Sequence, residues 1–274
     1  MTQLIQEMRA SYAFVERNFN LVKRYWGWEL VWLMYSIANA LSIAYIGAGM
    51  EQISGQTVDT NYLVLYLLVG ILVWRYLSIV FDAISEMIAW ERWEGTIEYT
   101  FMAPVSRLTH MLGQTIFSII YGLLFSGVIL GVVVIFFHLD LSQANLLGGA
   151  LVLLAGSVSF IGFGIMAAVL PLLFPERGAQ MTNVVQAILL LVSGVYYPVT
   201  VMPGWVQALA RLSPATYALE GIRQAVLQGV PLRSLLGTIG LLLAMGVLAI
   251  PAGVWIFSQA ERYAKRKGVL KRSG

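Results

Sequence analysis

The sequence predicts an all-α integral membrane protein with six transmembrane helices, and three observations lead to that fold class. Apolar residues make up 59% of the chain and charged residues only 11%, against about 25% charged residues in a typical soluble domain. Six long stretches carry few or no charges, and about 20 apolar residues suffice to cross the hydrocarbon core of a bilayer. Lysine and arginine are concentrated in alternate connections between these stretches, which is typical of a chain that crosses a membrane repeatedly.

The first element, residues 1–27, is predicted to be an amphipathic helix that lies in the membrane interface. Apolar residues recur there at every third or fourth position, as on a helix with one apolar face. These residues are Leu4, Met8, Tyr12, Val15, Phe19, Val22 and Trp26. The alternative is a soluble helix that packs on a partner protein.

Six membrane spans are predicted to follow, at residues 29–50, 60–83, 111–137, 145–171, 181–198 and 234–257. The segment between the fifth and sixth spans, residues 199–231, is semi-polar and interrupted by proline and glycine. It is predicted to be broken and partly re-entrant or interfacial, because non-helical backbone at membrane depth must be surrounded by protein or line a cavity.

The distribution of positive charge predicts the orientation of the chain. Lysine and arginine occur in residues 1–26, in the 84–110 and 172–181 loops and in the tail from residue 258, where they include Lys271 and Arg272. The 51–59 and 138–144 loops have none, and the 199–233 segment has three. Because positively charged loops stay in the cytoplasm, both termini are predicted to be cytoplasmic.

Three charged residues of the second helix, Arg75, Asp82 and Glu86, fall near one of its faces. Ionisable residues inside a membrane are costly and are commonly functional. Two interpretations stay open: Arg75 snorkels or pairs with Asp82 for structural reasons, or the three residues line a polar translocation path. The other spans have no acidic residue near their centres, which argues against proton or sodium coupling.

The sequence excludes most kinds of catalytic site. The absence of cysteine excludes disulfides, thiolate metal sites and cysteine nucleophiles. No phosphate-binding loop motif occurs, so we expect no nucleotide to bind this chain. His110 and His138 stand at opposite ends of the third span and are too far apart to share a metal ion. We therefore predict a protein without catalytic residues, metal or cofactor of its own.

The 84–110 loop is predicted to carry a short helix over Glu91–Met102. Glu91, Glu94 and Glu98 recur at spacings of three and four and form an acidic face. Ile97, Phe101 and Met102 form an apolar face, and Pro104 ends the helix. A compact cytosolic helix of this kind can bind in a groove of a soluble partner. The alternative is a solvated loop.

Two stretches resemble the ABC transporter permeases of the type-2 exporter class, including daunorubicin-resistance-like and polysaccharide-exporter-like members. The first resembles the pattern R-x-x-G-T-[LI]-E followed by x-P-[VL]-S-R, at Arg92, Gly95, Thr96, Ile97, Glu98, Pro104, Val105, Ser106 and Arg107. The second is similar to a signature after the fifth span, at Ser193–Pro198, Met202, Pro203, Trp205, Leu212, Ser213, Pro214, Tyr217, Ala218, Glu220, Arg223 and Gly229. The resemblance covers nearly the whole chain.

The resemblance implies a single permease domain, residues 1–274, whose 88–107 loop couples to a separate ATP-binding subunit. The coupling residues would be Glu91, Arg92, Glu94, Gly95, Thr96, Glu98, Pro104, Ser106 and Arg107. Residues 199–231 would form a re-entrant external hairpin that closes the outer end of the pathway. The pathway or gate residues would be Tyr196, Tyr197, Pro198, Pro203, Trp205, Glu220 and Arg223, although the family often has smaller residues or phenylalanine at the two tyrosines.

The same resemblance implies an exporter in the cytoplasmic (inner) membrane, built from two permease chains, identical or different, and two ATP-binding subunits that hold ATP and magnesium. The expected substrate is an amphiphilic, drug-like or lipid-like molecule, and no nucleic acid is expected as a partner. A polysaccharide or lipo-oligosaccharide exporter is the nearest alternative. An ion-coupled secondary transporter and a membrane scaffold are the alternatives from other classes.

Overall fold

The computed structural model describes residues 2–104, 106–268 and 270 of the chain. Val105 of the loop motif and the tail residues Lys271 and Arg272 lie outside the described residues, as does the side chain of Leu4. The described residues form helices and connecting loops without any strand, so the predicted all-α class is confirmed.

The helices follow the predicted order along the chain. They are α1 (Thr2–Arg24), α2 (Trp26–Ser54), α3 (Thr60–Glu94), α4 (Ile97–Met102), α5 (Arg107–Phe137), α6 (Leu146–Ala167), α7 (Val169–Leu173), α8 (Gly178–Ser193), the 3-10 turn η1 (Val199–Val201), α9 (Gly204–Ala210), α10 (Pro214–Leu227) and α11 (Leu232–Lys267). Five segments of the described chain are long and apolar enough to cross a membrane, namely Trp26–Ala48, α3, α5, Leu146–Leu173 and α11.

The fifth predicted span, residues 181–198, coincides with a shorter helix than expected. Helix α8 has 16 residues and ends at Ser193, because Gly194 adopts a left-handed conformation with φ of 73°. A glycine in this conformation ends a helix at little steric cost. The prediction that the helix continues to Pro198 is therefore wrong, and a count of six spans stays a prediction.

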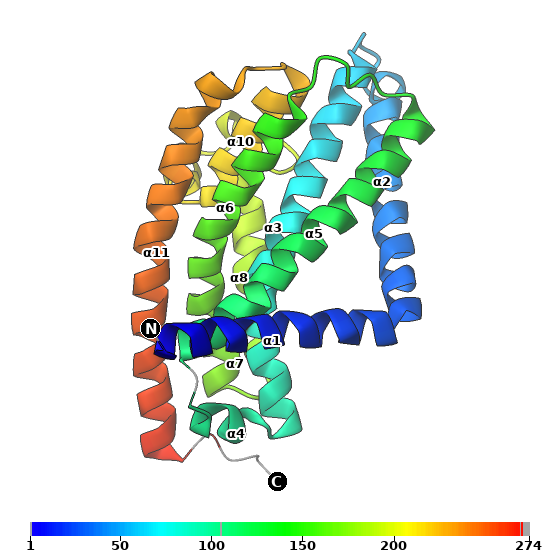
Figure 1. Ribbon diagram of the computed structural model, residues 1–274. Helices are drawn as coiled ribbons and strands as arrows, with labels where there is room; N and C mark the ends of the chain where they lie inside the picture. Colours follow the sequence, from blue (N-terminus) through cyan, green and yellow to red (C-terminus); the bar gives the residue numbers. More distant parts are fainter. Residues whose placement is uncertain (1, 105, 269, 271–274) are drawn as a thin grey trace.

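The long helices run side by side, and α1 lies across them (Figure 1). Helix α4, helix α7 and both ends of the described chain lie toward one end of this bundle, which we call the α4 end. The opposite end, the α10 end, holds α10 and the loops that follow α2 and α5. Asn145 joins two segments there, because its side-chain amide donates a 2.9 Å hydrogen bond to the carbonyl oxygen of Val230.

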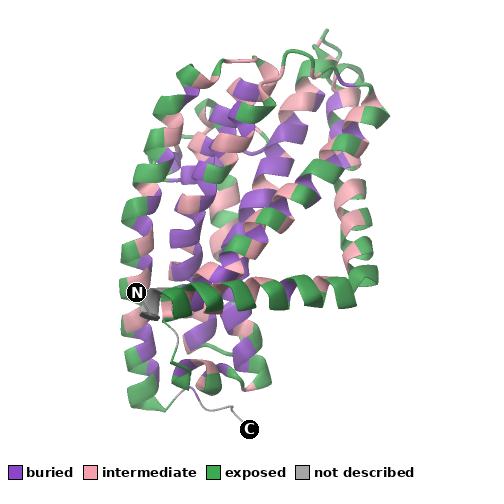
Figure 2. Ribbon diagram, viewed as in Figure 1, coloured by how far each residue is buried: buried purple, intermediate pink, exposed green. Residues whose placement is uncertain are grey.

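Helices α3 and α6 form the centre of the molecule, whereas α2, α5 and α11 expose much of their apolar surface (Figure 2). Exposed apolar residues on long helices are expected where lipid covers the outside of a protein. Two buried hydroxyl groups, of Tyr76 on α3 and Ser157 on α6, lie 2.6 Å apart and satisfy one another. The central pair thus combines apolar packing with a satisfied hydrogen bond.

Small residues allow α6 and α11 to approach closely. A Cβ atom added at Gly162 would lie 2.5 Å from the backbone of Ala249, and one at Gly246 would lie 2.8 Å from the backbone of Val158. Because backbone atoms cannot give way as a flexible side chain can, larger residues would force the two helices apart. Helices α6 and α11 are therefore closely packed at two separate levels of the bundle.

Candidate functional site

The coupling loop at the α4 end contains two helices instead of the single predicted one. Helix α3 continues through Glu91 and ends at Glu94, where Gly95 takes a left-handed conformation with φ of 76°. The chain then turns into the separate helix α4. The prediction of one helix with an acidic face over Glu91–Met102 is therefore wrong, because the glycine breaks the helix between Glu94 and Glu98.

Helix α4 is anchored by its apolar residues and exposes a mixed surface. Ile97 and Phe101 are buried in the core as predicted, whereas Met102, predicted on the same apolar face, is exposed. Tyr99 is 75% exposed and Trp93, at the end of α3, is 71% exposed. We call the surface formed by Trp93, Glu94, Glu98, Tyr99 and Met102 the α4 surface; Glu98 is its half-buried member.

Arg107, the first residue of α5, fastens α4 to the rest of the chain. Its guanidinium donates hydrogen bonds to the carbonyl oxygens of Thr100 (3.1 Å) and Phe101 (2.6 Å) at the end of α4. The guanidinium carbon also lies 4.2 Å from the centre of the Phe101 ring. A cation at the C-terminal carbonyl groups of a helix is electrostatically favourable. Arg107 thus holds the end of α4 by both charge and hydrogen bonding.

The same arginine connects α4 to α11. Its Nη2 atom lies 3.2 Å from Oε1 of Glu261, and Lys265 donates a 2.6 Å hydrogen bond to the same oxygen. Glu261 was not predicted as a site residue, and Lys265 was noted only among the positive charges of the tail. No pattern within one sequence joins Arg107 to a partner 154 positions away.

Two predicted coupling residues, Glu91 and Arg92, are buried instead of exposed. Nε2 of His110 lies 3.1 Å from Oε1 of Glu91, in contact but not aligned for a hydrogen bond. The ring of Phe14 packs against the His110 ring with 4.7 Å between their centres. Glu91 therefore lies where α1, α3 and α5 meet, and its position favours holding the loop in place over contact with a partner.

The remaining loop residues shape the turns around α4. Thr96 donates a backbone hydrogen bond to the carbonyl oxygen of Glu91 (2.9 Å), which closes the turn after Gly95. Pro104 is exposed beyond the end of α4. Ser106 begins α5, because its hydroxyl oxygen accepts a hydrogen bond from the backbone amide of Thr109 (3.1 Å).

Helix α1 also contacts this turn through Glu7. The backbone amide of Ser106 donates to the Glu7 carboxylate at 3.3 Å. Hydrogen bonding by Thr109 and by Ser106 lowers the pKa of the Glu7 carboxyl below its ordinary value. Charged Glu7 thus joins the end of the coupling loop to α1.

We expect Glu91 and Glu94 to behave differently when each is replaced by alanine, although they lie one turn apart. Glu91→Ala removes a buried contact of His110 and should lower the stability of the purified protein by about 1–3 kcal/mol. Glu94→Ala changes an exposed residue and should leave the melting temperature within about 1 °C of the original. Melting curves in detergent check both, and equal melting temperatures for the two variants would contradict the assignment of Glu91 as a buried support.

The three intramembrane charges do not form the predicted pair. Arg75 and Asp82 are seven residues apart, about 10 Å along the helix axis, and no ion pair joins them in the described part of the chain. Asp82 instead accepts a 2.6 Å hydrogen bond from the side-chain amide of Gln186 on α8. Arg75 lies over the ring of Phe125, 5.9 Å from its centre. Glu86 is exposed and lies about two turns before α3 ends at Glu94.

The segment after α8 folds back on α8 and α10. The hydroxyl groups of Ser193 and Ser213 lie 2.8 Å apart and join the two ends of this segment. The hydroxyl group of Tyr197 donates to the carbonyl oxygen of Leu191 at 2.9 Å. Tyr196, Pro203 and Trp205 are exposed, Trp205 to 71%. Hydrogen bonds thus hold the stretch between α8 and α10, which includes the first part of the predicted 199–231 segment, against its flanking helices.

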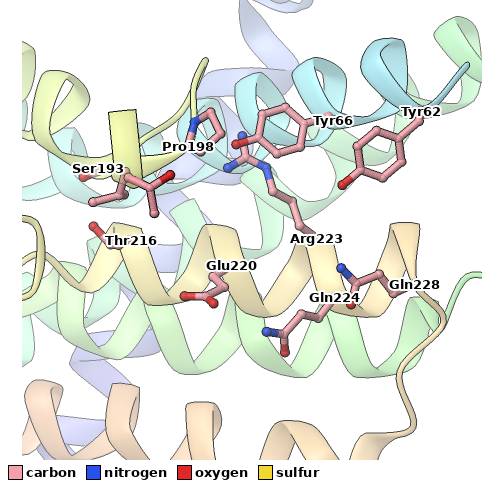
Figure 3. A pocket seen from close by; sticks show the side chains of 11 residues that line it. Tyr62, Tyr66, Ser193, Pro198, Thr216, Glu220, Arg223, Gln224 and Gln228 are labelled. Atoms are coloured by element: carbon pink, nitrogen blue, oxygen red, sulfur yellow. The ribbon is translucent and has the colours of Figure 1, made fainter. Parts of the chain in front are cut away.

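A pocket of about 290 Å³ lies between this segment, α3 and α10 (Figure 3). Its lining residues are Tyr62, Tyr66, Ser193, Pro198, Val199, Thr200, Thr216, Glu220, Arg223, Gln224 and Gln228. Of the predicted gate residues, Pro198, Glu220 and Arg223 line the pocket, whereas Tyr196, Tyr197, Pro203 and Trp205 lie outside it. We call it the α10-end pocket.

Arg223 organises the α10-end pocket. Its guanidinium donates hydrogen bonds to the carbonyl oxygens of Gly194 (3.0 Å) and Val195 (2.6 Å), and it lies 3.6 Å from the centre of the Tyr66 ring. Tyr62 and Tyr66 project from α3 toward it (Figure 3). Sequence reasoning missed both tyrosines, because aromatic residues at the start of a span are equally typical of the membrane interface.

The described residues offer no metal centre. No group of three or more histidine or acidic side chains within residues 2–104, 106–268 and 270 is placed so that it could hold a metal ion. The site therefore consists of a surface at the α4 end, a polar pocket at the α10 end, and charges between them.

Comparison with known proteins agrees with this arrangement. The family model described as ABC-2 type transporter matches residues 10–227, well over half of the chain. The chain is also 28% identical over 97 residues to the linearmycin resistance permease protein LnrN of Bacillus subtilis (strain 168). That match spans 35% of this chain and 25% of LnrN, so it covers about a quarter of that relative. On the extent of the family match, this multi-pass membrane protein belongs to the ABC-2 type transporter family.

Proposed function

We propose that this chain is the transmembrane subunit of an ATP-driven ABC exporter and forms the translocation pathway for an amphiphilic, drug-like or lipid-like substrate. Family membership supports a permease. The observation that carries the proposal furthest is α4, a short helix whose exposed residues are presented at one end of the bundle while Arg107 fixes its other side.

The α4 surface is the docking site for a separate ATP-binding subunit, present in two copies, which holds ATP and magnesium. Trp93 and Tyr99 supply large exposed rings, and Glu94 supplies charge, a combination that is typical of the centre and rim of protein interfaces. The other predicted coupling residues, Arg92, Gly95, Thr96, Pro104 and Ser106, shape the turns around it. This chain performs no hydrolysis itself.

The α4 end is the cytoplasmic side, and the membrane is the cytoplasmic one. Helix α1 lies in the interface: Met8, Tyr12 and Phe19 of its apolar stripe are exposed, while Phe14 and Asn18 contact α5. Helix α8 is the fifth of six spans, and α11 is the sixth. The 16 residues of α8 extend about 24 Å, less than the roughly 30 Å core, so residues 199–231 complete this crossing as a re-entrant external hairpin.

Two permease chains and two ATP-binding subunits form the working unit. ATP closes the two ATP-binding subunits on each other and moves both α4 helices together. Arg107 transmits this motion to Glu261 of α11, and the close packing of α11 on α6 carries it along the bundle. The hairpin that Arg223 holds against α3 then opens the outer end. Each step shifts a population between inward-open and outward-open states.

The nature of the substrate rests on different observations. The relative is a linearmycin resistance permease, which favours export of an amphiphilic antibiotic-like molecule. The α10-end pocket favours the second candidate, a polysaccharide or lipo-oligosaccharide, since Tyr62 and Tyr66 offer ring faces and Glu220, Gln224 and Gln228 offer hydrogen bonds. Flux of labelled substrates of each class through reconstituted transporter separates the two.

The absence of cysteine allows a direct test of orientation and partner. Tyr99→Cys on the α4 surface and Ser142→Cys in the 138–145 loop each introduce one thiol into the cysteine-free chain. We expect a membrane-impermeant maleimide to label Ser142→Cys in intact cells, and Tyr99→Cys only after the membrane is opened. A crosslinker on Tyr99→Cys should capture an ATP-binding subunit that carries a phosphate-binding loop.

Two results would overturn the proposal. One is labelling of Tyr99→Cys from outside intact cells. The other is substrate flux in liposomes that contain this chain alone and an ion gradient, since a secondary transporter needs no ATP-binding partner.

A further inference from the structure

A small polar pocket inside the membrane is formed by α2, α3 and α5, which pack against one another (Figure 1). It has a volume of about 70 Å³ and receives the polar side chains of Tyr35, Ser36, Asn39 and Arg75. Its other walls are apolar. About 10–15 Å³ of such space holds one water molecule, so this pocket accommodates several waters or one small anionic group. We call it the Arg75 pocket.

Arg75 forms no close ion pair within the described part of the chain, and the carboxylates of Asp82 and Glu86 act on its charge only over a longer range. Its Nε atom is buried without a hydrogen bond, and its one ring contact is the face of Phe125. The nearest carboxylates make their hydrogen bonds to other residues: Glu29 accepts one from Tyr121, and Asp82 accepts one from Gln186. Glu86 lies eleven residues on, about 16 Å along the helix. No carboxylate lines the pocket.

The groups around Arg75 are hydrogen-bond donors that are also unused. The side chains of Tyr35, Ser36 and Asn39 form no hydrogen bond with any other residue that the structure describes. A guanidinium, an amide and two hydroxyl groups around one cavity suit an acceptor with several oxygen atoms, such as a carboxylate or phosphate. They do not suit a cation.

With α1 in the interface, as proposed, the Arg75 pocket lies inside the hydrocarbon core. The side chain of Asn18 on α1 donates to Gln114 of α5, and Phe125 lies eleven residues beyond Gln114, about 16 Å along that helix. Although α5 runs obliquely (Figure 1), this distance places Phe125 well within a core of about 30 Å. An unpaired arginine at this depth is not left against lipid tails, because a charge inside a membrane faces protein, water or a polar ligand.

We propose that the Arg75 pocket binds the carboxylate or phosphate headgroup of the exported amphiphile as it passes through the membrane, while the tail lies along Ile71, Leu72 and Ile129. This inference rests on the proposed exporter function and makes the substrate an anionic amphiphile. Arg75 supplies the charge, and Ser36 and Asn39 supply further hydrogen bonds. The pocket is an intermediate binding site between the two ends of the bundle.

Binding to the purified permease tests this without the ATP-binding subunit. The anionic probe is dodecyl phosphate, and zwitterionic dodecyl phosphocholine is the comparison. Native mass spectrometry in a neutral detergent measures the fraction of permease that carries each bound ligand. We expect Arg75→Gln to weaken dodecyl phosphate binding at least tenfold and Arg75→Lys to weaken it less than about threefold. Arg233→Gln, an exposed arginine at the start of α11, is the matched control and should change nothing. Equal binding by the original protein and Arg75→Gln would overturn the proposal.

A second measurement distinguishes an exported amphiphile from a resident phospholipid. In the assembled transporter, dodecyl phosphate should stimulate ATP hydrolysis, and Arg75→Gln should remove at least nine-tenths of that stimulation. If Arg75→Gln instead removes copurified phosphatidylglycerol and leaves the stimulation intact, the pocket holds a structural lipid and the proposal fails. A failure of the exporter proposal would give a different result from a failure of the pocket proposal. The permease alone would still bind dodecyl phosphate through Arg75, but the assembled proteins would transport no substrate.

Discussion

Replacing Arg107 with alanine is expected to abolish ATP-driven transport while leaving the protein in the membrane. The substitution removes two hydrogen bonds to carbonyl oxygens of α4 and the contact with Glu261 of α11. Hydrogen bonds to charged groups contribute about 1.5–3 kcal/mol each. A net loss of about 3 kcal/mol changes the balance between docked and undocked α4 by roughly a hundredfold. Transport and ATP hydrolysis should therefore become uncoupled.

The measurement compares substrate-stimulated ATP hydrolysis with substrate flux in the same proteoliposomes. Arg266→Ala is the matched control, because Arg266 is exposed in the last turn of α11. It should retain nearly full flux. Arg107→Lys keeps the positive charge but lacks the planar guanidinium that donates to both carbonyl oxygens at once. We therefore expect partial flux. Full flux in Arg107→Ala would show that α4 needs no such anchor.

The second large effect is expected from adding a single methyl group, in Gly70→Ala on α3. The new Cβ would lie 2.2 Å from the carbonyl oxygen of Val195 and 2.9 Å from Nη2 of Arg223. The Val195 carbonyl is backbone and is also held by Arg223, so the hairpin has to move. Overpacking of this kind costs about 1–3 kcal/mol, more than the up to about 1 kcal/mol that alanine contributes in a helix.

We therefore expect Gly70→Ala to lower the melting temperature in detergent by roughly 5 °C and to reduce flux sharply, because the α10-end pocket loses its shape. Gly237→Ala is the matched control: a Cβ there has no neighbour within 4 Å in the described chain, so helix propensity alone predicts equal or higher stability. A Gly70→Ala protein as stable and active as the Gly237→Ala control would show that the hairpin does not rest on α3.

The sequence was most informative where one local rule decides the structure. Pro104 lies just beyond the end of α4, as predicted from its effect on a helix, whereas α5 begins at Arg107, four residues before the predicted start of the third span. The prediction of one helix over Glu91–Met102 failed at Gly95, because the acidic spacing was read without weighing a glycine that turns left-handed. The same kind of residue, Gly194, shortened the fifth predicted span.

Contacts between distant residues were beyond the reach of sequence reasoning. Arg107 and Glu261 are far apart in the chain, and nothing local distinguishes Glu261 from the other charges of the tail. Likewise, a pair between Arg75 and Asp82 was one of the interpretations that the sequence left open, and the structure instead joins the Asp82 carboxylate to the side-chain amide of Gln186 on α8. The stacking of Arg223 on Tyr66 also joins two helices that no periodic pattern relates.

Composition and periodicity by themselves determined that this protein is an all-α membrane protein with long helices, because a bilayer accepts long apolar stretches only as structures whose backbone groups bond within the segment. The two motifs also marked the two segments on which the proposed docking surface and the α10-end pocket lie. Which buried charges are paired, which side of α4 is exposed, and which residues enclose the two pockets depended on tertiary packing. Those features arise where helices distant in sequence meet, and the free energy of each contact depends on both partners.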